Sequence, residues 1–314
     1  MSSVVAATWG LASAVEAEEL LTLARSCGGV TWLHVGKLPD ASSDTASRFG
    51  VSEINQVPGP EFPGADTLVQ ALAQHCRTTR PRLVLFSQTF GSRLIAPRLA
   101  GRLGSPVVTN ALAIEISGAE TCVTASAYGG DANAVYRMTG PPPHLVGVMP
   151  NALAPEPAAT PTSPTVEAFE AGLSGTVERI RLVTPAHSEG QRLEDAQVIV
   201  AGGRGLGSAS NFHLVEELAE AAGGMPAASR PLVDDGWTDA SRQVGLTGRI
   251  TRPALYMALG VSGASQHMAG CSAAKTIVAV NRDPEAAIFR YAKYGIVGDC
   301  LEVIPELIRA VRER

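Results

Sequence analysis

Short apolar runs alternate with helical patterns along much of this chain, and no other feature of the sequence constrains the fold as strongly. In the first half, β-type runs rich in valine and leucine are separated by segments of helical periodicity. Such alternation favours a mostly parallel sheet with helices on both faces. The predicted strands are 4–9, 30–35, 82–86 and 106–109, and the predicted helices are 13–27, 66–77 and 91–103.

The segment from about 119 to 185 has a different pattern. Its short β-type runs are separated by Gly, Pro and Asp, and they predict an antiparallel extension of the first sheet. The proline-containing stretches 141–143 and 154–164 are typical of exposed connections. The four β-type runs are 120–127, 132–138, 144–148 and 177–184.

Strand–helix alternation returns at about residue 197. We therefore expect an α/β protein of two domains, each a mostly parallel sheet flanked by helices, with the second sheet doubly wound. The expected boundaries are a first domain at 1–188, a linker at 189–196 in a polar segment, and a second domain at 197–314. The predicted strands of the second domain are 197–201, 227–233, 255–261, 276–280 and 295–297, and its helices begin at about 210 and at 303.

The composition excludes several classes of protein. The chain of 314 residues has a net charge of −5 and no dense run of Lys or Arg, so nucleic acid and anionic membrane are not expected partners. No apolar run approaches the ~20 residues of a membrane-spanning helix, and the N-terminus does not resemble a signal peptide. The five cysteines are scattered without a C-x-x-C pair, which disfavours a disulfide framework and a zinc site and favours a cytoplasmic location.

The segment 258–270, Ala-Leu-Gly-Val-Ser-Gly-Ala-Ser-Gln-His-Met-Ala-Gly, carries the strongest functional signal. An apolar strand runs into a Ser-Gly-Ala turn at 262–264, where we expect a helix to begin and to present free backbone N–H groups to an anion. Gln266 and His267 then add an amide and a titratable imidazole. This combination suits a nucleotide cofactor, and a flavin more than a bare nucleotide. A tight strand-to-helix turn with a polar first turn is the alternative.

Three other segments place polar side chains at predicted strand ends. Arg204 lies in a glycine turn, where a cation is well placed for a phosphate or an anionic ring; a solvated loop arginine is the alternative. Ser229 and Arg230 end a predicted strand, and a surface Ser-Arg pair would look the same. Thr247 lies in the loop 243–248, whose glycines let backbone approach a flat ligand, although a plain turn has the same pattern.

Asn281 and Asp299 follow the last two predicted strands. Open α/β sheets bind their ligands at the carboxyl ends of strands, so both are candidate ligand contacts. Asp299 can accept hydrogen bonds from ribose hydroxyls or simply cap the next helix, and both readings stay open. We interpret Asp283, which precedes a proline, as a helix-start residue.

Two other groups of residues are interpreted as structural. The segment 87–92 precedes a helix that carries Arg93, Arg98 and Arg102, and we interpret it as a helix cap with arginines on a solvated face. The histidines outside 258–270 have no metal-ligand spacing, and H-E-x-x-H, G-x-S-x-G and P-loop motifs are absent from the sequence. We therefore expect no metal, and neither a hydrolase nor a kinase.

Taken together, these segments resemble the alpha subunit of electron transfer flavoproteins. The resemblance is strongest from about 197 to 307, and it is looser in the first half, where 96–100 and 128–134 carry it. The number and order of the motifs make it specific. The motifs of the second half are Gly202-Gly-Arg-Gly-Leu206, Ala228-Ser-Arg230, Gln243-Val-Gly245, Thr247-Gly248, Leu255-Tyr256, Gly260-Val-Ser-Gly263, Gln266-His267, 275–281, 283–286 and 294–297.

The resemblance implies an electron carrier without substrate turnover of its own. Its second domain would bind one FAD per complex, and its first domain would contact a smaller beta subunit, which would hold AMP or a second nucleotide if one is present. The heterodimer would pass electrons between flavin dehydrogenases, such as the acyl-CoA dehydrogenases of fatty acid β-oxidation, and a membrane quinone reductase or another acceptor. The FAD-binding residues implied are Arg204, Ser229, Arg230, Gln243, Val244, Gly245, Thr247, Ser262, Gly263, Ala264, Ser265, Gln266, His267, Asn281 and Asp299.

The resemblance also implies which parts of FAD these residues would meet. Residues matching Arg230, Thr247 and His267 surround the isoalloxazine ring in the family, and those matching 262–266 lie along the linking chain and phosphates. A cation or hydrogen-bond donor where charge develops on the ring favours the reduced flavin, which makes Arg230 and His267 the expected tuning residues. Thr247 would adjust the second electron and proton.

The sequence departs from the family pattern at a few positions. The departure nearest the expected site removes one polar flavin contact, and the others affect local charge, chain stiffness and subunit contact. They are Leu246 in place of Gln, Ala287 in place of Pro, Lys293 in place of Asp, and Met149 in place of Arg.

Two rival functions belong to other classes of protein. A nicotinamide-dependent oxidoreductase on a Rossmann domain is disfavoured because Ser208 stands where its fingerprint requires Gly or Ala. A non-redox adenine-nucleotide-binding subunit is disfavoured by the presence of Arg204, Gln266 and His267. The colour of the pure protein distinguishes them, because a flavin carrier is yellow.

Overall fold

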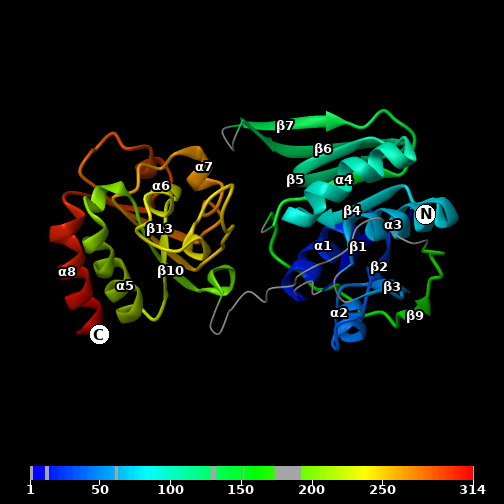
Figure 1. The fold of residues 1–314 in the computed structure, drawn as a ribbon, viewed down its shortest axis with the longest axis horizontal. Coiled ribbons are helices and arrows are strands. Elements are labelled where there is room, and N and C mark those ends of the chain that lie inside the picture. Colours follow the sequence, from blue (N-terminus) through cyan, green and yellow to red (C-terminus); the bar gives the residue numbers. More distant parts are fainter. Residues whose placement is uncertain are drawn as a thin grey trace. The chain divides into compact units, whose positions relative to one another are not determined.

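The computed structural model describes residues 3–10, 14–60, 63–128, 132–150, 152–173 and 192–313. The chain divides into two compact units, Met1–Ala127 with Asn133–Thr184, and Tyr128–Ala132 with Pro185–Arg314 (Figure 1). Both units are α/β, as predicted. The predicted strand 177–184 and residues 189–191 of the predicted linker 189–196 lie outside the described residues, so the predicted domain boundaries stay predictions.

The first unit is built on one nine-stranded sheet in the order β7-β6-β5-β8-β4-β1-β2-β3-β9. Along the sheet, each pair of neighbouring strands from β5 through β8, β4, β1, β2 and β3 to β9 is parallel. On its other side, β5 pairs with β6 in the antiparallel direction. The strands are β1 Ser3–Trp9, β2 Gly29–Val35, β3 Val51–Val57, β4 Leu83–Ser87, β5 Val107–Ser117, β6 Glu120–Ala127, β7 Ala132–Arg137, β8 His144–Val148 and β9 Thr165–Ala168. The helices are α1 Ala14–Cys27, α2 Ser42–Arg48, α3 Ala65–Thr79 and α4 Phe90–Leu103.

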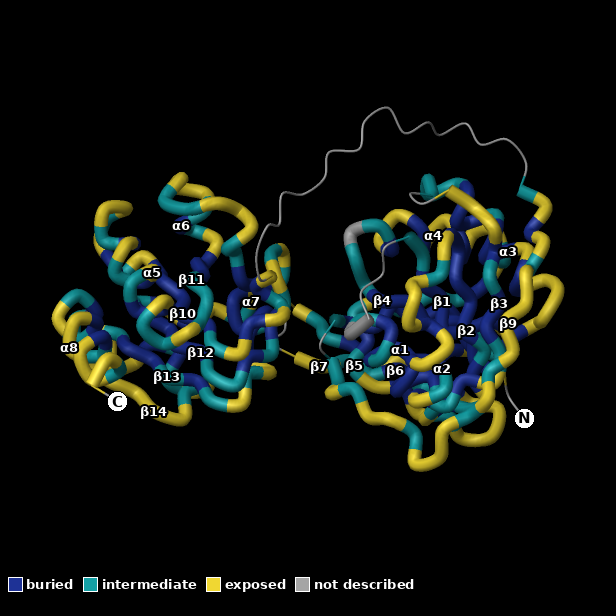
Figure 2. The backbone as a smooth tube through the Cα atoms, turned by 90° about the horizontal axis from the view of Figure 1, so that it is seen from below, coloured by how far each residue is buried: buried dark blue, intermediate teal, exposed yellow. Residues whose placement is uncertain are grey.

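Helices cover both faces of this sheet. Successive side chains of a strand point to opposite faces, and β1 follows this rule. Val4 packs in a buried cluster with Leu20 of α1, whereas Val5 packs in a second cluster with Leu72 of α3 and Leu99 of α4. The central strands β1, β2 and β4 are accordingly buried (Figure 2).

The prediction that 144–148 belongs to an antiparallel extension is wrong. The strand formed there, β8, lies between β4 and β5 and is parallel to both. All five of its residues are buried, as expected for a central parallel strand covered on both faces. The antiparallel part of the sheet is confirmed for β6, which pairs with β5.

The sequence patterns did not predict β3, α2 or β9. The apolar residues of β3, Val51, Ile54 and Val57, are three apart, so the strand lacks the alternation of period two. A polar residue, Asn55, is buried between them. Asn55 Oδ1 accepts a hydrogen bond from Nε2 of His75 at 3.0 Å, and its amide nitrogen donates to Glu53 at 2.7 Å. This buried network replaces apolar packing at that face of β3.

The second unit contains a five-stranded, fully parallel sheet in the order β11-β10-β12-β13-β14. The first strand, β10, lies between the second and the third, so the direction of winding reverses between β10 and β12. In sheets of this doubly wound type, ligands bind outside the carboxyl ends of the strands at the point of reversal. The strands are β10 Val198–Gly202, β11 Met225–Ala228, β12 Leu255–Leu259, β13 Thr276–Asn281 and β14 Tyr294–Val297.

The two faces of the second sheet are covered differently. The helices α5 (Phe212–Ala221) and α8 (Cys300–Arg312) pack on one face, where Val215 and Ile304 share a cluster with Leu259. The other face is covered by the segment around Val244 and by single helical turns, including α7 (Ser265–Met268). This second face carries the irregular chain that forms the site.

The prediction of a strand at 227–233 is wrong beyond residue 228. The strand β11 ends at Ala228, and the short helix α6 (Arg230–Asp234) follows it. Pro231 lies in the first turn of α6, where a missing N–H costs nothing, whereas proline cannot donate in a strand ladder. Among the described residues, no helix is both long and apolar enough to cross a membrane.

Candidate functional site

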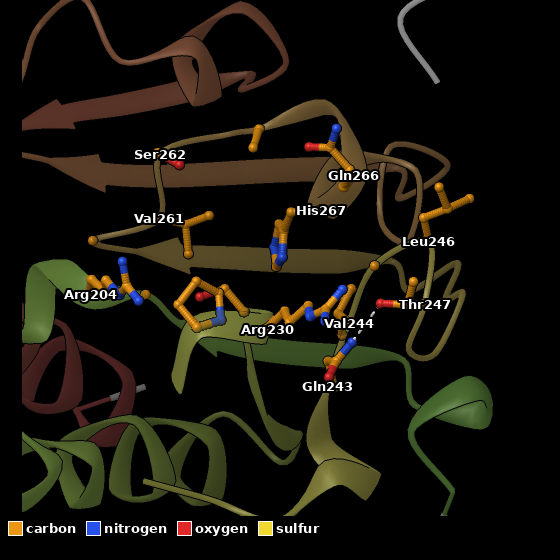
Figure 3. Close-up of a pocket in the computed structure, with 16 residues that line it drawn as sticks. Arg204, Arg230, Gln243, Val244, Leu246, Thr247, Val261, Ser262, Gln266 and His267 are labelled. Atoms are coloured by element: carbon orange, nitrogen blue, oxygen red, sulfur yellow. Dashed lines mark hydrogen bonds between the residues drawn. The ribbon is translucent and has the colours of Figure 1, made fainter. Parts of the chain in front are cut away.

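A pocket of about 450 Å³ lies at the carboxyl ends of β10, β11 and β12 (Figure 3). Its position matches the reversal point of the sheet, and its volume is in the usual range for small-molecule sites. The lining residues are Gly203, Arg204, Ser229, Arg230, Pro231, Gln243, Val244, Gly245, Leu246, Thr247, Gly260, Val261, Ser262, Ala264, Gln266 and His267.

The structure brings most of the predicted site residues together in this pocket. Gly263, Ser265, Asn281 and Asp299 are the predicted residues that do not line it. Sequence reasoning did not include five lining residues in the predicted site, although four of them are chain neighbours of a predicted residue and the fifth, Gly260, is two residues from Ser262. They are Gly203, Pro231, Leu246, Gly260 and Val261.

The glycines after β10 and β12 hold two loops in backbone-to-backbone contact. A Cβ on Gly203 would lie 2.3 Å from the carbonyl oxygen of Gly260, and one on Gly205 would lie 2.6 Å from its Cα. The N–H of Gly205 donates to that same carbonyl at 3.0 Å. Larger residues would therefore push the loops apart. These glycines fix the frame of the pocket, a role that the sequence pattern alone did not separate from contact with a ligand.

The helix expected after residues 262–264 is one turn long. The turn α7 spans four residues, and Ala264 at its start provides no side-chain cap. A helix dipole that favours anions needs several aligned turns, so the expected helix-dipole contribution is much reduced. Gly263, just before this turn, has a φ of +82°, and a Cβ there would lie 2.2 Å from the backbone nitrogen of Ile288. Gly263 therefore shapes the turn from behind the pocket.

His267 is the one titratable side chain that is both buried and in the pocket lining, within the part of the chain that the structure describes. It is 7% exposed, and its Nε2 lies 2.9 Å from the hydroxyl of Tyr256. Burial lowers the pKa of His267 to about 4, against a smaller opposing effect from the backbone of Val244. Its Nδ1 is buried without a hydrogen-bond partner of normal geometry. The imidazole is therefore neutral at pH 7 and keeps one ring nitrogen unsatisfied.

The two arginines of the pocket are exposed and each meets a carboxylate. Arg204 Nε lies 3.5 Å from Asp235, and Arg230 Nε lies 3.2 Å from Asp234. Exposed ion pairs contribute about 0–1 kcal/mol, so an anionic ligand can compete for these guanidinium groups. The interpretation of Arg204 as a merely solvated loop residue is therefore incomplete, because its side chain lines the pocket.

The loop 243–248 packs against the α7 turn. The N–H of Leu246 donates to the carbonyl oxygen of Gln266 at 2.7 Å. The side-chain amide of Gln243 donates to the hydroxyl of Thr247 at 3.0 Å, across the outer end of the loop (Figure 3). Gly245 has a φ of +144° and a Cβ on it would lie 2.9 Å from the Gln266 carbonyl oxygen. The loop is thus more than a plain turn, because it forms one wall of the pocket.

Asn281 and Asp299 make structural hydrogen bonds inside the chain. The amide nitrogen of Asn281 donates to the carbonyl of Val261 at 2.9 Å, and its Oδ1 accepts from the N–H of Asp283 at 3.0 Å. Asp299 is the N-cap of α8 and accepts from the N–H of Leu301 at 2.9 Å. The capping interpretation of Asp299 is therefore confirmed, while its ligand contact stays a prediction.

We expect Asp299→Ala to lower the free energy of unfolding by about 1 kcal/mol, because it removes the cap of α8. Asp299→Ser keeps a capping oxygen and is expected to restore most of this loss. Urea denaturation of the two variants beside the unmodified protein measures the effect. Equal losses in both variants would contradict a capping role.

The structural interpretation of 87–92 is also confirmed. Thr89 is the N-cap of α4, and its hydroxyl accepts from the N–H of Ser92 at 3.3 Å. Arg93, Arg98 and Arg102 are exposed. Among the residues that the structure describes, no three His, Cys, Asp or Glu side chains gather as metal ligands would.

Comparison with known proteins gives the same family for both units. Residues 13–174 match the electron transfer flavoprotein domain, and residues 192–272 match the electron transfer flavoprotein FAD-binding domain. The chain is 34% identical to the electron transfer flavoprotein subunit alpha of Thermoanaerobacterium thermosaccharolyticum, covering 94% of this chain and 92% of that protein. It is 32% identical to the subunit alpha of Bacillus subtilis (91% and 88%) and 36% identical to that of Mycobacterium tuberculosis (94% and 93%). The chain therefore belongs to the alpha-subunit family of electron transfer flavoproteins, and its second unit carries the FAD-binding domain of that family.

Proposed function

We propose that this chain binds one FAD in the pocket of its second unit and pairs with a beta subunit as an electron carrier. The observation that carries the proposal is the coincidence of the pocket with the matched FAD-binding domain: residues 203–267 supply the entire lining. The heterodimer would carry electrons between flavin dehydrogenases, such as acyl-CoA dehydrogenases, and a membrane quinone reductase or another acceptor. It would have no substrate turnover of its own, and AMP or another nucleotide, if present, would lie in the beta subunit.

The residues of the pocket fit a flavin in size, shape and donor chemistry. Glycine backbone at 245 and 260 gives a flat ligand close access, and the buried Nδ1 of His267 has no hydrogen bond of normal geometry within the described chain. Arg204 and Arg230 can meet anionic groups. We propose that all the residues implied by the family resemblance contribute to binding, with Gly263, Ser265, Asn281 and Asp299 acting from behind or beside the lining.

FAD, when bound, supplies the reversible one-electron and two-electron chemistry. The chain's own residues bind and orient it and set the charge around it. Arg230 offers a positive charge at the pocket, His267 offers a neutral ring nitrogen, and the Thr247 hydroxyl, held by Gln243, offers one more hydrogen bond. We propose that these three residues tune the potential. A cytoplasmic location and a role in fatty acid β-oxidation are parts of the same proposal.

The rival functions predict a different occupant for this pocket. In a nicotinamide-dependent enzyme, a glycine fingerprint lets the dinucleotide approach the first strand end. Here Ser208 stands at the critical position, and Gly203 and Gly205 pack against Gly260 instead. A non-redox nucleotide sensor would not need a buried, neutral imidazole in the pocket lining. Both observations support a flavin.

Co-expression with the neighbouring beta-like chain, followed by an absorbance scan, tests the proposal. We expect a yellow complex with a flavin spectrum and one FAD per heterodimer, identified by mass after release. A colourless complex, or one that holds NAD or only an adenine nucleotide, would overturn the proposal. Retention of FAD in Asp299→Ser then decides whether that carboxylate contacts the cofactor.

A further inference from the structure

Tyr256 lies directly beneath His267 and does not line the pocket. It is fully buried in β12 and points to the same face of the sheet as α7, in a cluster with Ala258 and Met268. Its hydroxyl lies 2.9 Å from Nε2 of His267, and the two rings are tilted by 59°. A tyrosine in an apolar strand reads as a core residue in the sequence, so this contact was not foreseen.

The direction of the Tyr256–His267 hydrogen bond decides which imidazole nitrogen carries the proton. If the hydroxyl donates to Nε2, the proton of the neutral ring is on Nδ1, and one buried group, the Nδ1–H, has no hydrogen bond of normal geometry, although the backbone of Val244 lies close to it. If Nε2–H donates to the hydroxyl oxygen, two buried groups lack a strong partner: the hydroxyl proton and the Nδ1 lone pair. Each buried polar group left without a hydrogen bond destabilises the folded protein. The first arrangement is therefore favoured.

A competing acceptor for the hydroxyl does not change this balance. The thiol of Cys271 also interacts with Tyr256, but thiol sulfur is a weak acceptor compared with an imidazole nitrogen. The Cys271 thiol itself donates to the carbonyl oxygen of His267, with Sγ and O 3.6 Å apart. Because burial also keeps the pKa of His267 at about 4, the ring has a single proton to place at pH 7.

We propose that Tyr256 is a positioning residue whose hydroxyl donates to Nε2 of His267 and thereby holds the imidazole proton on Nδ1, so that this histidine of the pocket lining is a neutral hydrogen-bond donor. His267 then acts on the pocket's ligand as an N–H group and not as a cation. A hydrogen bond accepted at Nε2 also polarises the ring and strengthens the Nδ1–H donor. The effect on FAD described below rests on the proposed function, whereas the position of the proton does not.

The position of the proton is measured by ¹⁵N NMR of the histidine-labelled heterodimer at pH 7. Neutral Nδ1–H and Nε2–H imidazoles give different nitrogen shifts and different ring-proton couplings, and the signals missing in His267→Gln assign the residue. We expect the unmodified complex to show His267 as the neutral Nδ1–H form. An Nε2–H form or an imidazolium would overturn the proposal, and this holds even if Tyr256→Phe fails to fold or the complex contains no flavin.

The role of Tyr256 itself is tested with Tyr256→Phe, with Tyr294→Phe as the control because Tyr294 is an exposed tyrosine of the same unit. In Tyr256→Phe we expect the FAD-free complex to lose its preference for Nδ1–H. In the FAD complex, the weaker donor is expected to reduce the preference for reduced over oxidised flavin by up to about tenfold. This change corresponds to a one-electron potential that is lower by about 59 mV. An unchanged proton position together with an unchanged potential would overturn the role. A colourless complex of the unmodified chain contradicts the proposed function instead.

Discussion

A Gly263→Ala variant is expected to lose several kcal/mol of the stability of the second unit. Gly263 has a φ of +82°, which costs about 1–2 kcal/mol for a residue with a Cβ. The added Cβ would lie 2.2 Å from the nitrogen and 2.4 Å from the Cα of Ile288. Both are backbone atoms, and that nitrogen donates to the carbonyl of Ser262 at 3.0 Å, so neither can move without breaking the turn. Urea denaturation followed by circular dichroism measures the loss.

Gly298→Ala is the matched control in the same unit. A Cβ on Gly298 meets only Val303 Cγ2, at the ordinary contact distance of 3.7 Å, and the backbone there is not left-handed. We expect its unfolding midpoint to stay within the range of a neutral surface change, about 0.5 kcal/mol. If Gly263→Ala unfolds at the same urea concentration as Gly298→Ala, the backbone packing described for the pocket is incorrect.

Acidification from about pH 6.5 to about pH 4 is expected to destabilise both units. Burial lowers the pKa of His75 in the first unit and of His267 in the second to about 4. An unfolded histidine has a pKa of about 6.5, so between these values the unfolded chain binds protons that the folded chain does not. The stability is therefore complete above pH 6.5 and is lost as the pH falls towards 4, by at most about 3 kcal/mol for each histidine.

Urea denaturation at a series of pH values tests this dependence. His75→Gln is expected to reduce the slope of the pH profile of the first unit, where His34, whose pKa is also lowered by burial, still contributes. His267→Gln is expected to flatten the profile of the second unit. His213→Gln, which changes an exposed histidine, serves as the control and is expected to leave both profiles unchanged. If the pH profiles of the free energy of unfolding of His75→Gln and His267→Gln run parallel to the profile of the unmodified protein, other groups cause the acid sensitivity.

The sequence predicted the sheets where apolar periodicity was the dominant signal. The strands β1, β4, β6 and β12 were found because their apolar residues form continuous or alternating runs. The pairing of β8 was not foreseen, since a run of five buried residues indicates a strand but does not name its neighbours. The strand β3 was missed because tertiary contacts of Asn55 with His75, invisible in a local window, replace apolar alternation.

The site was more predictable than the topology, because its polar residues follow strand ends that meet at one edge of a sheet. The exceptions have physical causes. Asn281 and Asp299 are engaged by hydrogen bonds inside the chain, which a sequence cannot distinguish from contacts with a ligand. Tyr256 was missed because a hydrophobic pattern counts a buried tyrosine as an apolar core residue and does not show that its hydroxyl makes a hydrogen bond near the site.

The contact of Gly203 and Gly205 with Gly260 has a consequence for engineering. Because main-chain atoms define this part of the pocket, the shape of this part does not depend on the side chains that line the rest of it. Leu246 and Pro231 border the same space and are only partly buried, so they can be exchanged on a fixed frame. A library confined to these two positions would vary the surroundings of the ligand while leaving the scaffold intact.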